Sequence, residues 1–254
     1  MSELTQQRQS QTQSPALDQA GSVEGEQPRP RAVRPVDSST LILVARQRNQ
    51  AKILMGKRSA KHSFMPNKFV FPGGRVDRCD SRLLPPRDLH PAVMARLTRD
   101  CSESRARALG LAAIRETYEE TGLILGENAT APIKTRSPQW RQFLQHGINP
   151  RLDTLHYIAR AITPPYRSRR FDNRFFMAET EGLIDTKDID ALGGSGELLE
   201  IHWVSLSEAR ELELPRITRI VLDEVEKRLL QGHSPEQQGP FSYFRRGKPI
   251  RDTV

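Results

Sequence analysis

The sequence predicts an α/β fold for one domain over about residues 38–232, and two observations support it. Short apolar runs that are typical of buried strands recur along this span. Two longer segments with helical periodicity alternate with them. The chain has 254 residues, enough for one sizeable domain or two small ones. It has no stretch of about eighteen apolar residues, so we expect neither a membrane span nor a membrane partner.

The first part of the domain is predicted to be a strand hairpin followed by a short strand. Residues 1–37 are rich in Gln, Ser, Pro and Glu, which indicates a disordered leader. Residues 38–45 and 52–57 read as two buried strands with a polar turn between them. A third strand, 68–71, ends at Pro72 and the pair Gly73-Gly74. Glycines there allow the backbone to approach a ligand closely.

Residues 75–121 are predicted to be mainly helical. Prolines interrupt the segment 75–105, within which 92–101 has amphipathic helical spacing. Ser102 or Ser104 is expected to cap a longer helix over about 105–121, and Gly122 is the expected stop.

The second half of the domain is predicted to alternate strands with helices. A short helix is expected over 138–146, and strands over 152–162, 171–178 and 198–204. Helices are expected over 206–214 and 216–231, and the second has a clear apolar stripe. Residues 233–254 are predicted to be a basic tail.

Three glutamates in the last two turns of the 105–121 helix form the strongest candidate site. Glu116, Glu119 and Glu120 share one helix face. Negative charge at a helix C-terminus is unfavourable, and Glu116 and Glu120 also repel each other as an i,i+4 pair. A bound divalent cation is the simplest compensation, because Mg²⁺ prefers oxygen ligands.

The residues R-E-x-x-E-E-x-G, here Arg115 to Gly122, resemble the second half of the Nudix box. Gly73-Gly74 is similar to its beginning. The resemblance implies an α/β/α sandwich with a mixed β-sheet. It also implies a hydrolase that cleaves nucleoside diphosphates linked to another moiety. Gly74 and Arg115 are forty-one positions apart, far more than is usual, so residues 75–105 are interpreted as an insertion within the box.

The same resemblance implies roles for individual residues. Glu116, Glu119 and Glu120 would be catalytic residues and ligands of Mg²⁺ or Mn²⁺, and Arg115 would orient them. A carbonyl of Gly73 or Gly74 would be a further ligand. Glu197 is the candidate for a later acid, with Glu200 second. The expected substrate-binding residues are Arg58, Arg170 and Arg174.

The upstream glutamate of the Nudix box stays unassigned. Counting forward from Gly74 leads to Asp80, whereas counting back from Arg115 leads to Arg107. Glu103 is the nearest glutamate.

The long insertion resembles that of coenzyme A diphosphatase-like members, so coenzyme A or an acyl derivative is the leading substrate. ADP-ribose, dinucleoside polyphosphates and oxidised nucleotides share the same diphosphate. The insertion is interpreted as a lid, a specificity element or a contact of a homodimer. The alternative is a catalytically idle Nudix-fold module that binds a nucleotide or RNA through its arginines. The three retained glutamates favour an enzyme.

The formal net charge of +8 lies in the body of the chain. Two basic clusters contribute, one over 167–174 and one over 245–251. They favour an anionic partner. A phosphorylated small molecule is expected, with nucleic acid less favoured. The two cysteines have neither disulfide nor metal spacing, which fits a reducing cytoplasm.

Overall fold

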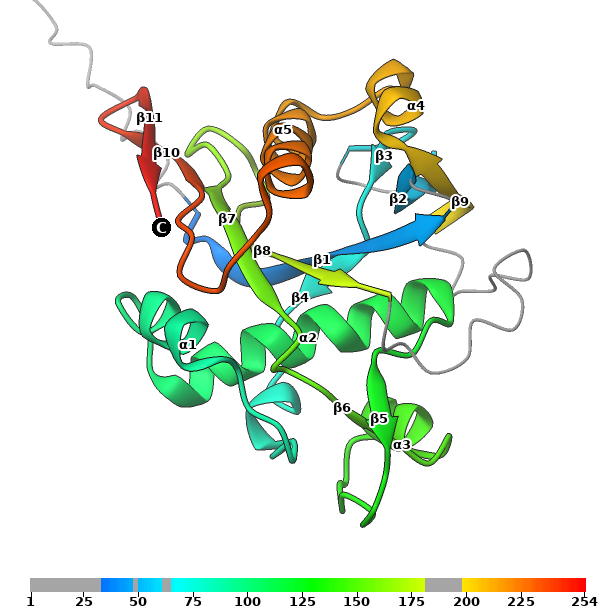
Figure 1. Ribbon diagram of the computed structural model, residues 1–254. Coiled ribbons are helices and arrows are strands. Elements are labelled where there is room, and N and C mark those ends of the chain that lie inside the picture. The colour runs from blue at the N-terminus through cyan, green and yellow to red at the C-terminus, as the bar shows by residue number, and fades with distance from the viewer. Residues whose placement is uncertain (1–32, 48–49, 61–64, 181–197) are drawn as a thin grey trace, which may run out of the picture. The chain divides into compact units, whose positions relative to one another are not determined.

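The computed structural model describes residues 33–47, 50–60, 65–180 and 198–254 (Figure 1). Within this part of the chain, nine strands form one sheet in the order β11-β10-β7-β8-β1-β2-β3, with β4 paired to β1 and β9 to β2. The strands of this sheet are β1 Val36–Gln47, β2 Gln50–Arg58, β3 Phe69–Val70, β4 Gly73–Arg75, β7 His156–Ile162, β8 Phe171–Glu179, β9 Leu198–Ser205, β10 Pro240–Arg245 and β11 Lys248–Thr253.

The sheet is mixed, as predicted. Its two central strands, β1 and β8, run parallel, and so do β7 and β10. The remaining neighbours are antiparallel, among them β1 with β2 and β1 with β4. A separate pair is formed by β5 Gly126–Asn128 and β6 Ile148–Pro150.

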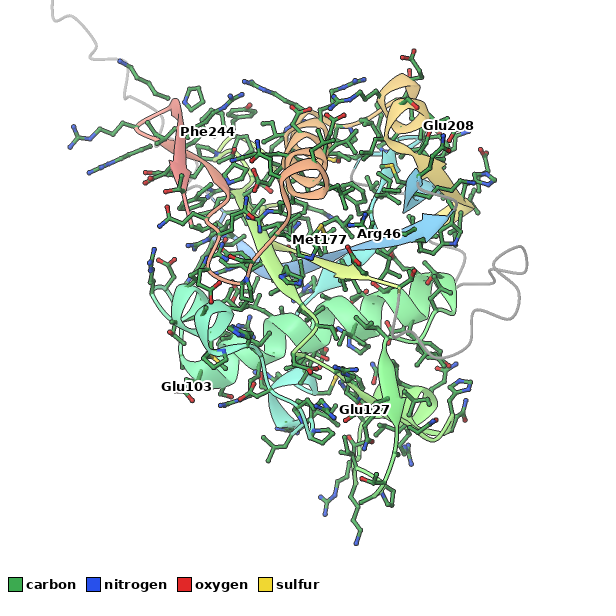
Figure 2. The ribbon with its side chains drawn as sticks, in the orientation of Figure 1. Arg46, Glu103, Glu127, Met177, Glu208 and Phe244 are labelled. Carbon is green, nitrogen blue, oxygen red and sulfur yellow. The ribbon has the colours of Figure 1, made fainter. Side chains whose placement is uncertain are left out.

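Helices cover both faces of the sheet (Figure 1). The long helix α2, Glu103–Thr121, lies on one face, and α4, Leu206–Glu211, and α5, Arg216–Gln231, lie on the other. Each interface is an apolar core. Leu41 and Phe176 pack with the α2 side, whereas Ile42 and Met177 pack with Val221 on the α5 side. Figure 2 labels Met177 between the sheet and α5. This alternation along β1 and β8 reflects the period of two in a strand. The result is the predicted α/β/α sandwich.

The insertion contains regular structure that packs against α2. After β4 come a short 3-10 helix, η1 Asp80–Arg82, and α1, Pro91–Leu97. Proline stands at the first turn of α1, where its missing N–H costs nothing. Leu83, Leu89 and Val93 are buried in the α2-side core. The predicted helix over 92–101 is therefore present but shorter. After the insertion and α2, the short helix α3 spans Pro138–Leu144.

The prediction of a basic tail over 233–254 is wrong. Residues 240–253 form the hairpin β10–β11, and β10 joins the sheet beside β7. Phe241 packs against the α2-side core, and the guanidinium of Arg160 lies 4.6 Å from its ring centroid. The many Arg and Lys residues of this segment hide the alternation of Phe241 and Tyr243 along β10, and Ile250 of β11 lies opposite Tyr243. Of the predicted leader, Val36 and Asp37 already belong to β1, and residues 1–32 lie outside the described part.

No helix in the described segments combines the length and apolar character needed to cross a membrane. Cys79 and Cys101 are both free.

Candidate active site

The site is built on the C-terminal half of α2. The helix begins at the N-cap Ser102, whose hydroxyl accepts a hydrogen bond from Arg105 N. It ends at Gly122, which has φ +79°, the left-handed conformation that glycine adopts at little cost. Leu111 and Ile114 are fully buried and fix the rotation of the helix about its axis. The predicted cap, stop and core-facing positions are thus confirmed.

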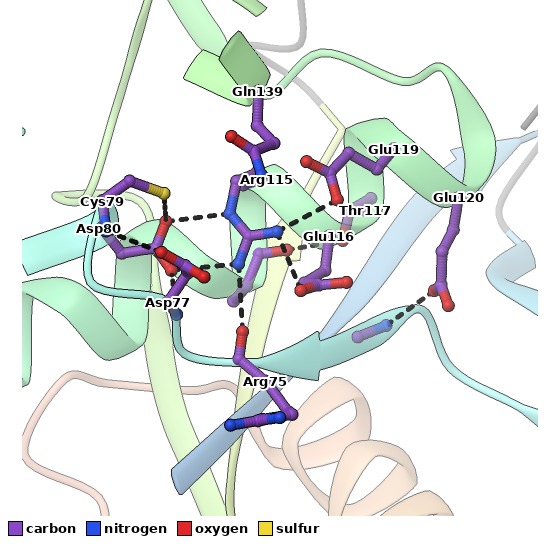
Figure 3. A network of polar contacts seen from close by, with 12 residues as sticks. Arg75, Asp77, Cys79, Asp80, Arg115, Glu116, Thr117, Glu119, Glu120 and Gln139 are labelled. Carbon is purple, nitrogen blue, oxygen red and sulfur yellow. Dashed lines mark hydrogen bonds and ion pairs between the residues drawn. The ribbon is translucent and has the colours of Figure 1, made fainter. Parts of the chain in front are cut away.

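Arg115 is the centre of the polar network (Figure 3). Its Nη1 donates to Glu116 Oε1 at 2.8 Å and to Glu119 Oε2 at 3.0 Å. Its Nη2 donates to the carbonyl of Arg75 at the end of β4. The side chain is almost fully buried, so these charge-assisted hydrogen bonds are strong and hold both carboxylates in fixed positions.

Asp80 completes this network from the insertion. Its carboxylate accepts from Arg115 Nε at 2.9 Å and from Arg115 Nη2 at 3.0 Å, a two-pronged pair in which Asp80 is fully buried. Trp140 Nε1 and the backbone N–H of Asp77 also donate to it, at 2.9 and 2.8 Å. Sequence reasoning left the equivalent of the upstream Nudix-box glutamate unassigned, with Asp80, Arg107 and Glu103 as the positions considered. The structure brings Asp80 to Arg115, while Arg107 pairs with Asp88 and Glu103.

The two glycines allow β4 to lie directly against the helix. A Cβ on Gly74 would stand 2.3 Å from Glu116 Oε2, and one on Gly73 would stand 2.3 Å from the carbonyl oxygen of Ser39. Either contact is far inside van der Waals distance. Side chains at these positions are therefore excluded by packing, and the Glu116 carboxylate occupies the space that Gly74 leaves open.

Glu120 turns away from the other two carboxylates. It is buried and its Oε2 accepts a hydrogen bond from Gly73 N at 2.9 Å (Figure 3). Glu120 therefore ties the helix end to the start of β4, while Glu116 and Glu119 face Arg115.

Burial and neighbouring charges shift the pKa values of both Arg115 and Glu116. Burial alone would lower the pKa of Arg115, but the hydrogen bonds that Arg115 donates to Asp80 and the charges of Glu116, Asp80 and Glu119 raise it overall. Burial raises the pKa of Glu116 to about 7, against the opposing effect of the Arg115 charge, and the charge of Glu119 adds to the increase. The ionised form of Glu116 is thus incompletely compensated by Arg115.

Within the described residues, no three Asp, Glu, His or Cys side chains stand close enough together to hold a metal ion. Glu120 is engaged with Gly73, which leaves Glu116 and Glu119 as the adjacent pair. This pair still suits a hard cation, because Mg²⁺ is often held by only one or two protein carboxylates. The Glu116 carboxylate lies against Gly74 with no side chain between them, and its raised pKa agrees with a cation beside it.

The remaining predicted residues lie elsewhere. Glu197 is outside the described residues, and Glu200 pairs with Lys57. Arg58 ends β2, opposite Leu198 of β9.

The two arginines of β8 and its preceding turn have structural partners. Arg174 is buried and pairs with Asp37 and Asp172, and Arg170 donates to the carbonyls of Thr163 and Val33. Asp37 also pairs with Arg105, ten residues before Arg115 on α2 and so about 15 Å along the helix axis. In the described structure the side chains of Arg170 and Arg174 are thus engaged within the fold, and their role as phosphate contacts stays a prediction.

A sheet between two helical layers, with a Gly-Gly strand end packed against an Arg-Glu-x-x-Glu-Glu helix end, is a Nudix arrangement. The structure is similar to the crystal structure of a NUDIX hydrolase from Alicyclobacillus acidocaldarius, with a TM-score of 0.57 and 25% identity. That match covers 75% of this chain and 90% of the other. The chain is therefore similar to Nudix hydrolases in both fold and sequence.

Two curated relatives give a more particular likeness. One is the acyl-coenzyme A diphosphatase NUDT19 of Xenopus laevis, 28% identical over 210 residues, which covers 63% of this chain and 54% of the relative. The other is the putative nudix hydrolase 7 of Caenorhabditis elegans, 26% identical over 168 residues, with 62% and 48% covered. The chain thus spans about half the length of each relative. No family model matches the chain.

Proposed function

We propose that this chain hydrolyses a diphosphate bond in a nucleoside diphosphate linked to another moiety, with Mg²⁺ or Mn²⁺ as cofactor. The observation that carries the proposal is the pair Glu116 and Glu119, both bonded to one nitrogen of Arg115 beside Gly74. Phosphoryl-transfer catalysis rests mainly on positioning and on charge stabilisation, so it needs charged groups that are held rigidly. The likeness to Nudix hydrolases supports the reaction class.

The proposed metal ligands are Glu116, Glu119 and Glu120, with the Gly74 carbonyl and Glu197 as further candidates. Carboxylate and carbonyl oxygens are the donors that Mg²⁺ and Mn²⁺ prefer. When bound, the cation would neutralise phosphate oxygens and lower the pKa of the attacking water. One of these glutamates would take the proton of that water.

The other residues act through these carboxylates. Arg115 holds Glu116 and Glu119 together, and Asp80 and Trp140 hold Arg115 in turn. Glu120 fixes the backbone at Gly73, and so the position of the neighbouring Gly74. A displacement of any of these groups would move the carboxylates, and small misplacements of catalytic groups reduce turnover strongly.

The proposed substrate is coenzyme A or an acyl-coenzyme A. The proposal is supported by the likeness to the acyl-coenzyme A diphosphatase NUDT19 and by the long insertion within the box. Arg58, at the end of β2 and opposite Leu198 of β9, remains the proposed phosphate contact.

The test is a substrate panel with the full chain. Coenzyme A, an acyl-coenzyme A, ADP-ribose and a dinucleoside polyphosphate are incubated with Mg²⁺ or Mn²⁺, and the phosphate-containing products are quantified. We expect hydrolysis of coenzyme A compounds in both metals and none in EDTA. Glu119→Gln and Glu120→Gln should keep the circular dichroism spectrum of the wild type and lose turnover by orders of magnitude.

Three results would contradict parts of this proposal. Unchanged hydrolysis in both variants would reject the assigned site. Binding of the panel compounds without product in either metal would instead support a catalytically idle module. Hydrolysis of ADP-ribose alone would retain the reaction and reject the coenzyme A assignment.

A further inference from the structure

Two basic segments that are far apart in the sequence meet at one edge of the sheet. The first is the turn between β7 and β8, and the second is the tip of the hairpin β10–β11. Tyr166 of the turn and Phe244 of β10 are in edge-to-face contact, with ring centroids 6.0 Å apart and planes at 88°. We call the surface around this contact the hairpin-tip surface; its exposed members are Tyr166, Arg167, Arg245, Arg246 and Lys248.

The cations of the hairpin-tip surface carry uncompensated charge. Among the described residues, Arg167, Arg245, Arg246 and Lys248 form no ion pair, and the tip itself contributes no carboxylate. Some arginines elsewhere on the surface are paired, as Arg210 is with Asp223 and Glu226. Arg82 and Arg99 also form no ion pair among the described residues, but they are scattered, whereas the cations of the hairpin-tip surface are clustered. Arg245, Arg246 and Lys248 lie within four residues, and the contact of Tyr166 with Phe244 brings Arg167 beside them. Four unpaired positive charges gathered in this way create a local positive potential that attracts polyanions.

Tyr166 adds a flat ring to this charged surface. Its side chain is 72% exposed, and it is the one aromatic among the large apolar side chains that are exposed in the described part of the chain. Phe244 supports the ring from its edge, and the Arg167 guanidinium lies 5.9 Å from its centroid. An exposed ring beside unpaired cations is the combination that binds single-stranded nucleic acid, where bases stack and phosphates pair with cations.

We propose that the hairpin-tip surface binds single-stranded nucleic acid, with one base stacked on Tyr166 and phosphates on the surrounding cations. An anionic membrane fits less well, because Phe244 and Ile250 are partly covered and no cluster of apolar side chains is available for insertion. An acidic peptide would account for the cations but not for the exposed ring.

This surface is separate from the candidate active site. In the sheet order, β7, β8 and β1 lie between β10 and β4. Four strand spacings amount to about 19 Å across the sheet. The proposal therefore does not depend on the proposed hydrolysis, and binding is to be measured in EDTA.

The experiment is fluorescence anisotropy with a labelled single-stranded RNA of twelve nucleotides, titrated with the full chain at several KCl concentrations. We expect binding, and we expect the logarithm of the association constant to fall linearly with log[salt]. The slope should be about −0.7 for each phosphate that the chain neutralises. Arg245→Gln/Arg246→Gln/Lys248→Gln should reduce this slope by roughly two and weaken binding at least tenfold. Tyr166→Ala should weaken it by about 5- to 150-fold, the usual effect of losing one stacked base, while Tyr166→Phe should bind like the wild type.

A matched control changes the same number of charges elsewhere. Arg82→Gln/Arg99→Gln/Lys227→Gln removes three exposed and scattered cations and should leave both affinity and slope nearly unchanged. The proposal is overturned if the wild type does not bind the RNA, or if the control and the hairpin variant weaken binding equally. It is also overturned if vesicles of phosphatidylcholine and phosphatidylserine bind the chain through the same residues and the RNA does not.

Discussion

At Glu116, burial and a neighbouring positive charge act in opposite directions on one carboxylate. Burial is the larger effect, so the pKa of Glu116 is raised from 4.5 to about 7 although Arg115 donates to it at 2.8 Å. Arg115 divides its charge among Glu116, Glu119 and Asp80, which explains why it compensates none of them fully. A free energy cost therefore accompanies the ionisation of Glu116 in the folded, metal-free chain.

Glu116→Gln should remove this cost. Folded Glu116 holds its proton to a higher pH than unfolded Glu116, so wild-type stability falls as the pH rises from 4.5 towards 7. In EDTA, we expect the variant to match the wild type at pH 5 and to be more stable by about 1–3 kcal/mol at pH 8. Urea unfolding at both pH values measures the difference. The exposed Glu211→Gln is the control, and an equal pH dependence in both variants would contradict the raised pKa.

Gly74→Ala should separate the geometry of the site from the stability of the fold. The new methyl group would stand 2.3 Å from Glu116 Oε2, so the carboxylate must move away from β4. We expect turnover to fall by about 100-fold or more, since small displacements at an active site have effects of that size. The matched control is Gly147→Ala, where φ is +71° and the added methyl meets nothing within 4 Å.

The Gly147→Ala control should lose about 1–2 kcal/mol of stability, because alanine is strained in the left-handed conformation, and keep its turnover. Steady-state hydrolysis and thermal unfolding of both variants make the comparison. A Gly74→Ala chain that turns over like Gly147→Ala would show that Glu116 need not lie against Gly74.

Substitutions of Asp80, in the insertion, and of Trp140, on α3, test how these two segments hold Arg115 of α2 in place. Asp80→Asn leaves the buried Arg115 with an incomplete set of partners, which typically costs about 3–5 kcal/mol. Trp140→Phe removes a single hydrogen bond to Asp80 and should cost about 1–3 kcal/mol. Both costs are read from urea unfolding. A loss below about 1 kcal/mol for Asp80→Asn, as for an exposed ion pair, would mean that Arg115 is held by Glu116 and Glu119 alone.

At the scale of elements, local patterns predicted most of the helices and strands. The spacing of Leu111 and Ile114, the cap at Ser102 and the stop at Gly122 identify α2 because these signals are local in the chain. The apolar runs of β1, β2, β8 and β9 identify strands for the same reason. Strand neighbours are different, since the parallel pairing of β1 with β8 joins residues more than a hundred positions apart.

The parts of the site that sequence reasoning missed depend on such long-range contacts. Asp80 is thirty-five positions from Arg115, and Trp140 is sixty positions from Asp80. The forward count from Gly74 did lead to Asp80, but nothing local distinguished this aspartate from the other acidic residues of the insertion. The surroundings of Arg174 show the same limit. Its arginine-rich segment suggested phosphate binding, but nothing local indicated that the side chain is buried and paired with Asp37, 137 positions away.

At the scale of the whole molecule, buried charges link parts of the chain that are far apart. Arg160 of β7 pairs with Asp172 of β8 and with Asp100 near the start of α2. Arg96 of α1 donates to the carbonyls of Pro235 and Val254. The insertion, the sheet and the C-terminal segment therefore unfold together in our interpretation, because separating them would leave buried guanidinium groups without acceptors.

The last prediction concerns the C-terminal boundary of the fold. A chain that ends at Gln231 should lose about 5 kcal/mol or more of its stability, a large part of the 5–15 kcal/mol typical of a domain. The truncated chain lacks the packing of Phe241 and the backbone oxygens that accept hydrogen bonds from Arg96.

In the full chain, Phe241→Ala should cost about 2–4 kcal/mol, because its ring contacts the core and Arg160. Phe244→Ala, on the other face of β10, should cost about 1 kcal/mol, because its ring contacts the exposed Tyr166. Urea midpoints measure all three, and a truncated chain as stable as the full one would restore the view of this segment as a dispensable tail.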